Sequence, residues 1–205
     1  MNIINASYEI MDELDGKEIL KKLERVARTC YKSEDKITDG SAERLVRALC
    51  KSKHEAMLEH FSFSVKFIVD RGVSHELVRH RVFSFAQEST RYCNYSKDKF
   101  GNELTFIFPH WLLNRDHDKF TEALGNTEKY YFTLLDQGWT PQEARQVLPN
   151  ALKTEICMTG FESDWKHFLD LRYFEVTGKA HPDMKELATK IVEQFKNNNI
   201  KIGEI

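Results

Sequence analysis

Residues 79–92, with the sequence RHRVFSFAQESTRY, place cationic and hydrogen-bonding side chains among apolar ones. Arg79, His80, Arg81 and Arg91 stand in this stretch together with two phenylalanines, a valine and an alanine. A solvated basic face would carry less apolar material, so we expect the guanidinium groups to be half-buried against the aromatic rings. Since a half-buried guanidinium requires an anionic partner, the stretch predicts binding of a phosphorylated or carboxylated small molecule.

The spacing of the glycines excludes the loops that hold phosphate through the backbone. The nine glycines are nowhere closer together than 13 residues. A P-loop and a GxGxxG dinucleotide turn both need clustered glycines. Any phosphate must therefore be held by side chains and helix N-termini, which gives the arginines more weight.

Arg79 and Arg81 point in different directions if they lie on a helix. Successive helical residues are rotated by roughly 100°, so the two guanidiniums cannot both grip one small phosphate. Either the ligand is long, or neighbouring subunits share the site, or the helix ends at this point. The competing interpretation is a surface helix in which Glu76 forms ion pairs with His80 and Arg79.

A further arginine lies on the apolar stripe of a predicted helix. Trp165, Phe168, Leu169 and Arg172 recur at helical spacing. Arg172 either extends its charged end to solvent from the end of the stripe or aims a desolvated guanidinium at a ligand. Arg145 allows the same two interpretations.

Histidine and cysteine patterns give little support for a metal centre or a thiol nucleophile. His54 and His60 are six positions apart, whereas a helical zinc motif places its histidines one turn apart. The four cysteines form no CxxC pair, and none lies beside a histidine or after a proline. We expect no metal and no catalytic cysteine.

Composition favours one globular domain over residues 1–205. The apolar share of 41% suffices for a core, and a net charge of −2 gives no basic field of the kind that nucleic-acid binders use. No apolar run reaches the length of a membrane span, and the acidic N-terminus lacks the apolar core of a signal peptide. A cytoplasmic protein that binds neither nucleic acid nor membrane is expected.

Periodicity predicts the α+β class, with an antiparallel or mixed sheet packed by helices. Strands are expected over 61–69, 104–108 and 152–158. Helices are expected over 17–29, 42–50 and 117–137, from a capping box at Thr140, from Ser163 to about Phe174, and from Pro182. A helix capped by Ser74 should run into Arg79–Arg81.

Five motifs in one order resemble the flavin-dependent thymidylate synthases. Arg79-His80-Arg81, seven residues and Ser89 match that family's RHR-x7-S. The other four cover most of residues 25–192 and are ARTCY from Ala27, HEAMLEH from His54, ARQVLP from Ala144 and FLDLR from Phe168.

The resemblance implies a homotetramer with shared active sites that binds FAD and converts dUMP to dTMP. Methylenetetrahydrofolate would supply the carbon and NADPH the hydride, which passes through the flavin, and no protein nucleophile would attack the pyrimidine. An RNA- or nucleotide-binding module without catalysis, or a flavin-independent nucleotide hydrolase or transferase, remains the alternative.

The resemblance also assigns roles residue by residue. It implies that Arg172 contacts the uracil and favours its ionisation at N3, which is electrostatic catalysis. The implied FAD ligands are Glu59, Arg79, His80, Arg81, Gln87 and His167. The implied dUMP ligands are Glu76, Arg79, Gln87, Ser89, Thr90, Arg91, Arg145 and Arg172. His54 and Tyr92 are assigned to the folate and flavin face.

Several positions depart from the family pattern. Ala56 replaces a frequent hydroxyl residue, and Glu76 replaces a frequent glutamine, which places an acid near an anionic nucleotide. Phe161 and Ser163 stand where a polar pair is common. These departures predict that the adenine end of FAD is held differently, whereas the uracil end keeps its expected residues.

Overall fold

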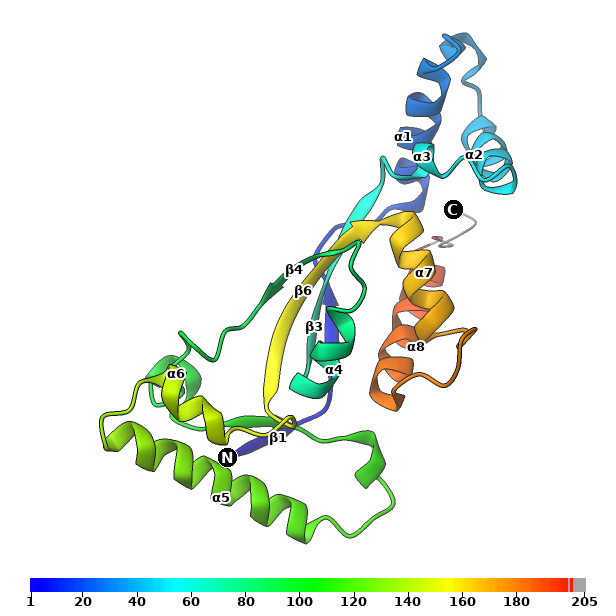
Figure 1. The fold of residues 1–205 in the computed structure, drawn as a ribbon. Helices are drawn as coiled ribbons and strands as arrows, with labels where there is room; N and C mark the ends of the chain where they lie inside the picture. The colour runs from blue at the N-terminus through cyan, green and yellow to red at the C-terminus, as the bar shows by residue number, and fades with distance from the viewer. Residues whose placement is uncertain (199, 201–205) are drawn as a thin grey trace. The chain divides into compact units, whose positions relative to one another are not determined.

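The chain forms a mixed α+β fold in which helices pack on sheets, which confirms the predicted class (Figure 1). The computed structural model describes residues 1–198 and residue 200. Two compact units make up the chain. Unit 1 comprises Met1–Glu9, Lys66–His80 and Phe85–Cys157, and unit 2 comprises Ile10–Val65, Arg81–Ser84 and the described residues from Met158 onward. The single domain over 1–205 stays a prediction.

A four-stranded sheet contains two long strands of nine residues each. Its order is β2 (Ser7–Ile10), β3 (Ser62–Asp70), β6 (Lys153–Phe161) and β4 (Ser84–Gln87). The Glu162 amide donates to the Phe61 carbonyl, and the Arg71 amide to the Leu152 carbonyl, so β3 and β6 run antiparallel. Strands β1 (Asn2–Ile4) and β5 (Thr105–Ile107) pair in parallel. The larger sheet therefore contains the expected antiparallel pairing, and the smaller sheet is parallel.

Unit 1 is organised around a core of aromatic and aliphatic side chains. Its helices are α4 (Arg71–Leu77), α5 (Asp118–Asp136) and α6 (Pro141–Ala144), with 3-10 turns at Asp98–Phe100, His110–Leu112 and Arg145–Val147. The predicted capping box starts α6, since the Thr140 amide donates to Glu143 Oε2 at 2.8 Å. The core cluster consists of Tyr95, Leu104, Phe106, Leu124, Tyr131, Ala144 and Leu152.

Unit 2 contains the first residues of β3 and five helices. They are α1 (Gly16–Thr29), α2 (Ser41–Lys51), α3 (Glu55–Leu58), α7 (Glu162–Arg172) and α8 (Pro182–Asn197), with a 3-10 turn at Glu34–Lys36. The Phe63 ring stacks on Trp165 with centroids 4.6 Å apart and meets Phe195 edge-on at 5.1 Å. The apolar face of α8 is buried and consists of Met184, Leu187, Ala188, Ile191 and Phe195.

Two predicted helix caps are wrong. Asp70, not Ser74, caps α4, because its carboxylate accepts the Val73 amide at 2.6 Å. Helix α7 begins at Glu162, where Asp164 accepts the Phe161 amide at 2.9 Å, so Ser163 is not its cap. At the start of both helices an acidic side chain, and not the nearby serine hydroxyl, accepts a backbone amide. No helix among the described residues has the length and apolarity to span a bilayer.

Candidate functional site

Gln87, at the end of β4, is held by hydroxyl groups from two other elements of unit 1. Its side-chain amide donates to Ser74 Oγ at 2.9 Å and to Thr154 Oγ1 at 3.2 Å. Ser74 belongs to α4 and Thr154 to β6, and both are fully buried. The Ser74 hydroxyl in turn donates to the carbonyl of Arg71 at 2.9 Å. A half-buried amide with two hydrogen-bond partners keeps a defined orientation, so Gln87 is fixed before any ligand binds.

Arg71 is a candidate site residue that sequence analysis missed. Its Nη1 donates to the carbonyl of Glu88 at 3.3 Å and to Thr154 Oγ1 at 3.3 Å. Thus Arg71, at the start of α4, reaches the segment that follows Gln87. The sequence Asp70-Arg71-Gly72 indicates a turn, and the only available signal was a cation directly after a buried strand.

A second guanidinium reaches the same segment from the turn after α6. Arg145 Nη1 donates to Thr90 Oγ1 at 3.4 Å, and Thr90 is buried. This contact brings together two residues that lie 55 positions apart in the chain. Arg145, with its half-buried side chain, therefore lies beside residues 88–92 of the same chain, a segment that we call the 88–92 loop.

The 88–92 loop is a tight turn centred on Ser89. The Ser89 carbonyl accepts the amides of Tyr92 at 3.1 Å and Cys93 at 2.9 Å, while its hydroxyl accepts the Arg91 amide at 3.3 Å. Arg91 Nε donates to Gln142 Oε1 at 2.6 Å, and its guanidinium lies 5.2 Å from the centre of the Tyr92 ring. The loop therefore presents hydroxyl, amide and guanidinium donors close together.

Three guanidiniums meet the 88–92 loop without being neutralised. Arg71, Arg91 and Arg145 donate only to carbonyl, hydroxyl and amide oxygens. In the part of the chain that the structure describes, no carboxylate lies within ion-pair distance of any of the three. Such a group of donors has an excess of positive charge and suits a phosphate.

The RHR segment lies in a turn and not on a helix. Helix α4 ends at Leu77, and the amides of Arg79 and His80 donate to the carbonyls of Glu76 and Leu77. The alternative in which the helix ends at this point is therefore confirmed. His80 is buried, but the Arg79 and Arg81 side chains are exposed.

The expected half-burial is wrong for three arginines. Arg79, Arg81 and Arg91 are all exposed in the chain. Arg79 and Arg81 lie in a turn beyond the end of α4, and Arg91 lies in a loop beyond the end of β4, where the Tyr92 ring that it contacts is itself exposed. By contrast, the half-buried arginines at the loop are Arg71 and Arg145, which come from other elements.

Unit 2 holds the remaining predicted residues. His54 and Glu59 flank α3 and are exposed, and α3 packs against α7, which carries His167 and Arg172. Arg172 is half-buried and ends a helix whose Trp165, Phe168 and Leu169 are buried, so its predicted stripe is confirmed. Both interpretations of its guanidinium stay open.

A mostly apolar cavity of about 560 Å³ lies among α1, α2 and α3 in unit 2. His54 lines it together with Cys30, Tyr31, Leu49 and Met57. The predicted dUMP ligands other than Arg172 all belong to unit 1; they are Glu76, Arg79, Gln87, Ser89, Thr90, Arg91 and Arg145. Of the predicted flavin and folate residues, Arg79, His80, Gln87 and Tyr92 belong to unit 1, and His54, Glu59, Arg81 and His167 to unit 2.

Comparisons with known proteins agree on one family. The model of the family described as thymidylate synthase complementing protein matches residues 11–198. A flavin-dependent thymidylate synthase of Pyrococcus furiosus is 31% identical over 175 residues, which are 82% of this chain and 69% of that protein. One of Pyrococcus abyssi is 32% identical over 168 residues, which are 80% of this chain and 66% of that protein.

A solved structure shares the fold. The crystal structure of a UMP/dUMP methylase, PolB from Streptomyces cacaoi, bound with 5-Br dUMP, superimposes with a TM-score of 0.76 at 22% identity. The match covers 100% of this chain and 95% of that one. With the family match and the relatives above, the chain belongs to the flavin-dependent thymidylate synthase family.

Proposed function

We propose that the chain catalyses the reductive methylation of dUMP to dTMP, with methylenetetrahydrofolate as carbon donor, NADPH-reduced FAD as hydride source and no protein nucleophile. Family membership supports this reaction. The observation that carries it is the group of Arg71, Arg91 and Arg145, whose positive charge no carboxylate neutralises among the described residues. This group offers the 5′-phosphate of dUMP a site that needs no glycine loop.

The 88–92 loop would hold the phosphate of dUMP. Ser89 and Thr90 supply hydroxyls, and Arg71, Arg91 and Arg145 supply charge. Each charge-assisted hydrogen bond contributes about 1.5–3 kcal/mol, so two or three such bonds give most of the affinity expected for a nucleotide. Gln87, fixed by Ser74 and Thr154, and Glu76 and Arg79 would contact the rest of the nucleotide.

Arg172 would act on the uracil ring. A guanidinium beside the pyrimidine stabilises the anion formed when N3 loses its proton, and this raises electron density at C5. C5 can then attack the carbon donor without a thiol adding to the ring. Its half-buried position at the end of α7 suits this role, because a cation acts more strongly where water is partly excluded.

The residues assigned to FAD fit an anionic, aromatic cofactor. Arg79 and Arg81 are exposed, and within the described chain neither has a carboxylate at ion-pair distance, so both can meet a diphosphate. When bound, FAD would supply hydride transfer. His80, Gln87, Glu59 and His167 would orient it, and the exposed His54 and Tyr92 rings would offer flat faces to flavin and folate.

We also propose a cytoplasmic homotetramer with shared active sites. Tyr92 is 76% exposed and Val82 66% exposed, beside predicted ligands, and a neighbouring subunit would cover them. All four cysteines lie in the described part of the chain as thiols and not as disulfides, in keeping with a reducing compartment.

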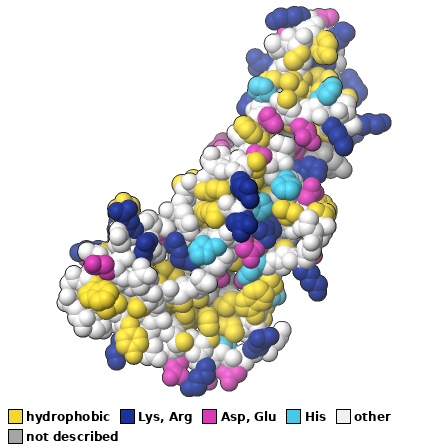
Figure 2. Space-filling model, in the orientation of Figure 1, with side chains coloured by type: hydrophobic (Ala, Val, Ile, Leu, Met, Phe, Trp, Pro, Cys, Tyr) yellow, Lys and Arg dark blue, Asp and Glu magenta, His cyan; other side chains and the backbone are white. Residues whose placement is uncertain are grey.

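An RNA-binding module is disfavoured by the distribution of charge. On the face drawn in Figure 2, lysine and arginine side chains stand in separate groups among acidic and apolar ones. An RNA-binding surface needs a continuous basic stripe. A flavin-independent nucleotide hydrolase would use the same arginines but would bind no flavin, and the visible spectrum of the purified protein separates the two.

Arg172→Ala tests the proposed function. We expect this variant to keep bound FAD, measured by its visible spectrum. Formation of dTMP from dUMP, methylenetetrahydrofolate and NADPH should fall by about 100- to 1,000-fold, as for the loss of a group that stabilises charge in the transition state. Lys166→Ala is the matched control, since Lys166 is exposed on the same helix and pairs with Asp170. Turnover of Arg172→Ala at the parent rate, or a parent protein that binds no flavin, would contradict the proposal.

A further inference from the structure

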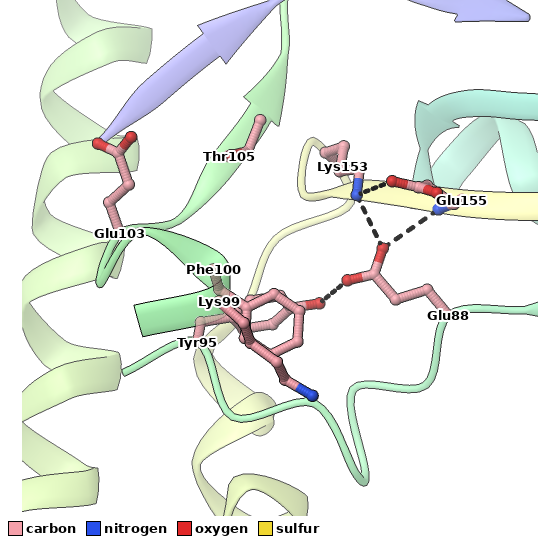
Figure 3. A pocket seen from close by; sticks show the side chains of 8 residues that line it. All are labelled: Glu88, Tyr95, Lys99, Phe100, Glu103, Thr105, Lys153 and Glu155. Carbon is pink, nitrogen blue, oxygen red and sulfur yellow. Dashed lines mark hydrogen bonds and ion pairs between the residues drawn. The ribbon is translucent and has the colours of Figure 1, made fainter. Parts of the chain in front are cut away.

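A carboxylate in the 88–92 loop points away from the predicted phosphate site. Consecutive residues at a strand end face opposite sides of the sheet. Gln87 turns to Ser74 and Thr154, whereas Glu88 turns into a cavity of about 430 Å³ in unit 1, which Lys153 and Glu155 of β6 also line (Figure 3). The side chain of Glu88 is therefore not placed to touch a phosphate bound at the loop.

Glu88 accepts hydrogen bonds from three groups at once (Figure 3). Its Oε1 accepts the Tyr95 hydroxyl at 2.8 Å. Its Oε2 accepts Lys153 Nζ at 3.1 Å and the backbone amide of Glu155 at 3.2 Å. Lys153 Nζ also donates to Glu155 Oε1 at 2.7 Å. Since the Glu88 backbone amide donates to the Glu155 carbonyl at 2.9 Å, this residue is tied to β6 by main chain and side chain together.

Charge and burial make this arrangement stiff. The side chains of Glu88 and Lys153 are 12% and 19% exposed, and Tyr95 is buried. Burial of the Lys153 amine opposes its charge, yet the hydrogen bond to Glu155 and the charge of Glu88 outweigh burial and raise the pKa of Lys153. Burial and the negative charge of Glu88 raise the pKa of Tyr95, so its hydroxyl stays a donor. Removal of one side chain from this hydrogen-bonded network would leave another buried polar group without its hydrogen bond.

The network brackets the predicted phosphate ligands. Glu88 precedes them and Tyr95 follows them, and the hydrogen bond between these two side chains closes the segment into a loop. Ser89, Thr90 and Arg91 lie inside it. The loop can therefore hold its donors in one arrangement before the nucleotide arrives, which lowers the ordering cost of binding.

We propose that Glu88, anchored by Lys153 and Tyr95, is a positioning residue that fixes the 88–92 loop for the 5′-phosphate of dUMP without touching the nucleotide. This inference rests on the proposed function. The consequence is specific: loss of Glu88 should weaken recognition of the phosphate and leave recognition of the nucleoside intact. A general loss of structure would weaken both.

Glu88→Gln in the full chain tests the proposal by titration with dUMP and with deoxyuridine, which lacks the phosphate. We expect the Kd of dUMP to rise about tenfold and that of deoxyuridine to change by less than about twofold, as for the loss of a hydrogen-bonded charge that acts through the loop. The KM for dUMP should rise in parallel, while kcat at saturating dUMP stays within about threefold. Glu103→Gln is the matched control, because Glu103 lines the same cavity but pairs with the N-terminal amine.

Tyr95→Phe provides a second test should Glu88→Gln fold poorly. It removes one hydroxyl donor and should raise the Kd of dUMP by about threefold, again without changing that of deoxyuridine. Unchanged dUMP affinity in both variants, or equal losses for dUMP and deoxyuridine, would overturn the positioning role alone. A parent protein that binds the two ligands equally well would overturn the phosphate site of the proposed function and this inference with it.

Discussion

Gly160→Ala should destabilise unit 2 through a steric clash with the Phe83 ring. A Cβ at Gly160, on β6, would lie 2.5 Å from both Cδ1 and Cε1 of Phe83 and 3.2 Å from Cβ of Asp164. The backbone of Gly160 lies outside the left-handed region, so the methyl group meets no conformational barrier of its own. Most of the cost therefore comes from displacing the Phe83 ring, and a smaller part comes from shifting Asp164.

The surroundings of Phe83 set the magnitude. The ring is buried and meets the fully buried Trp165 edge-on, with centroids 4.9 Å apart and planes at 80°. It has little room to retreat, and overpacking of this kind costs about 1–3 kcal/mol. For a chain of this size each 1 kcal/mol lowers the melting temperature by about 2–4 °C, so we expect a fall of roughly 2–12 °C.

Differential scanning calorimetry of three variants checks the mechanism. Gly125→Ala is the control, because Gly125 lies within α5 and its added Cβ would meet nothing within 4 Å, so its melting temperature should stay the same or rise. In the Gly160→Ala background, Phe83→Leu should recover part of the lost melting temperature. In the parent protein, Phe83→Leu should not raise the melting temperature. Phe83 lies two residues after Arg81, an assigned FAD ligand. Displacement of Phe83 should therefore also lower the FAD content of the Gly160→Ala protein. A Gly160→Ala protein that melts like its parent would refute the reasoning.

Two further substitutions address the site. Arg71→Met should raise the KM for dUMP by about ten- to hundredfold, which corresponds to the loss of one charge-assisted hydrogen bond. The KM of Arg71→Lys should lie between those of the parent and Arg71→Met, because a lysine keeps the charge but not the planar donor pair. An unchanged KM in steady-state kinetics over a range of dUMP concentrations would exclude this role. Cys93→Ala should keep kcat within about threefold, because the reaction needs no thiol; a complete loss of dTMP formation in a folded protein would show that a cysteine takes part.

Elements with a strong hydrophobic periodicity could be predicted from the sequence, whereas short and partly exposed strands could not. Strand β3 alternates Phe63, Val65, Phe67 and Val69 toward the core, and this pattern marked it in the sequence. Strands β1, β2 and β4 have three or four residues each and no alternation between fully buried and exposed positions, so their pairing depends on neighbours that are distant in the chain. The helix caps failed for a related reason, because several side chains near each helix start can act as caps.

The sequence predicted site residues only where they belong to a contiguous motif. The 87–91 segment and Arg145 belong to motifs, and the structure joins them through Thr90. Arg71 and Thr154 carry no motif, and they reach the site because β3 and β6 pair in the sheet. Local composition also misjudged burial, since the aromatic residues between Arg81 and Arg91 do not shield either guanidinium in the chain.

The positive charge at the 88–92 loop results from how the acids are placed, not from a shortage of them. The chain has 32 acidic residues and 30 lysines and arginines. In unit 2 the fold neutralises Arg28 with Glu24 at 2.7 Å, in a pair only 11% and 3% exposed. At the loop, Arg71 and Arg145 contact only a carbonyl and hydroxyls, and the loop's own carboxylate, Glu88, faces Lys153 on the other side of the sheet. Because the loop's own acid is both turned away and neutralised, its charge does not compete with a phosphate for the guanidiniums.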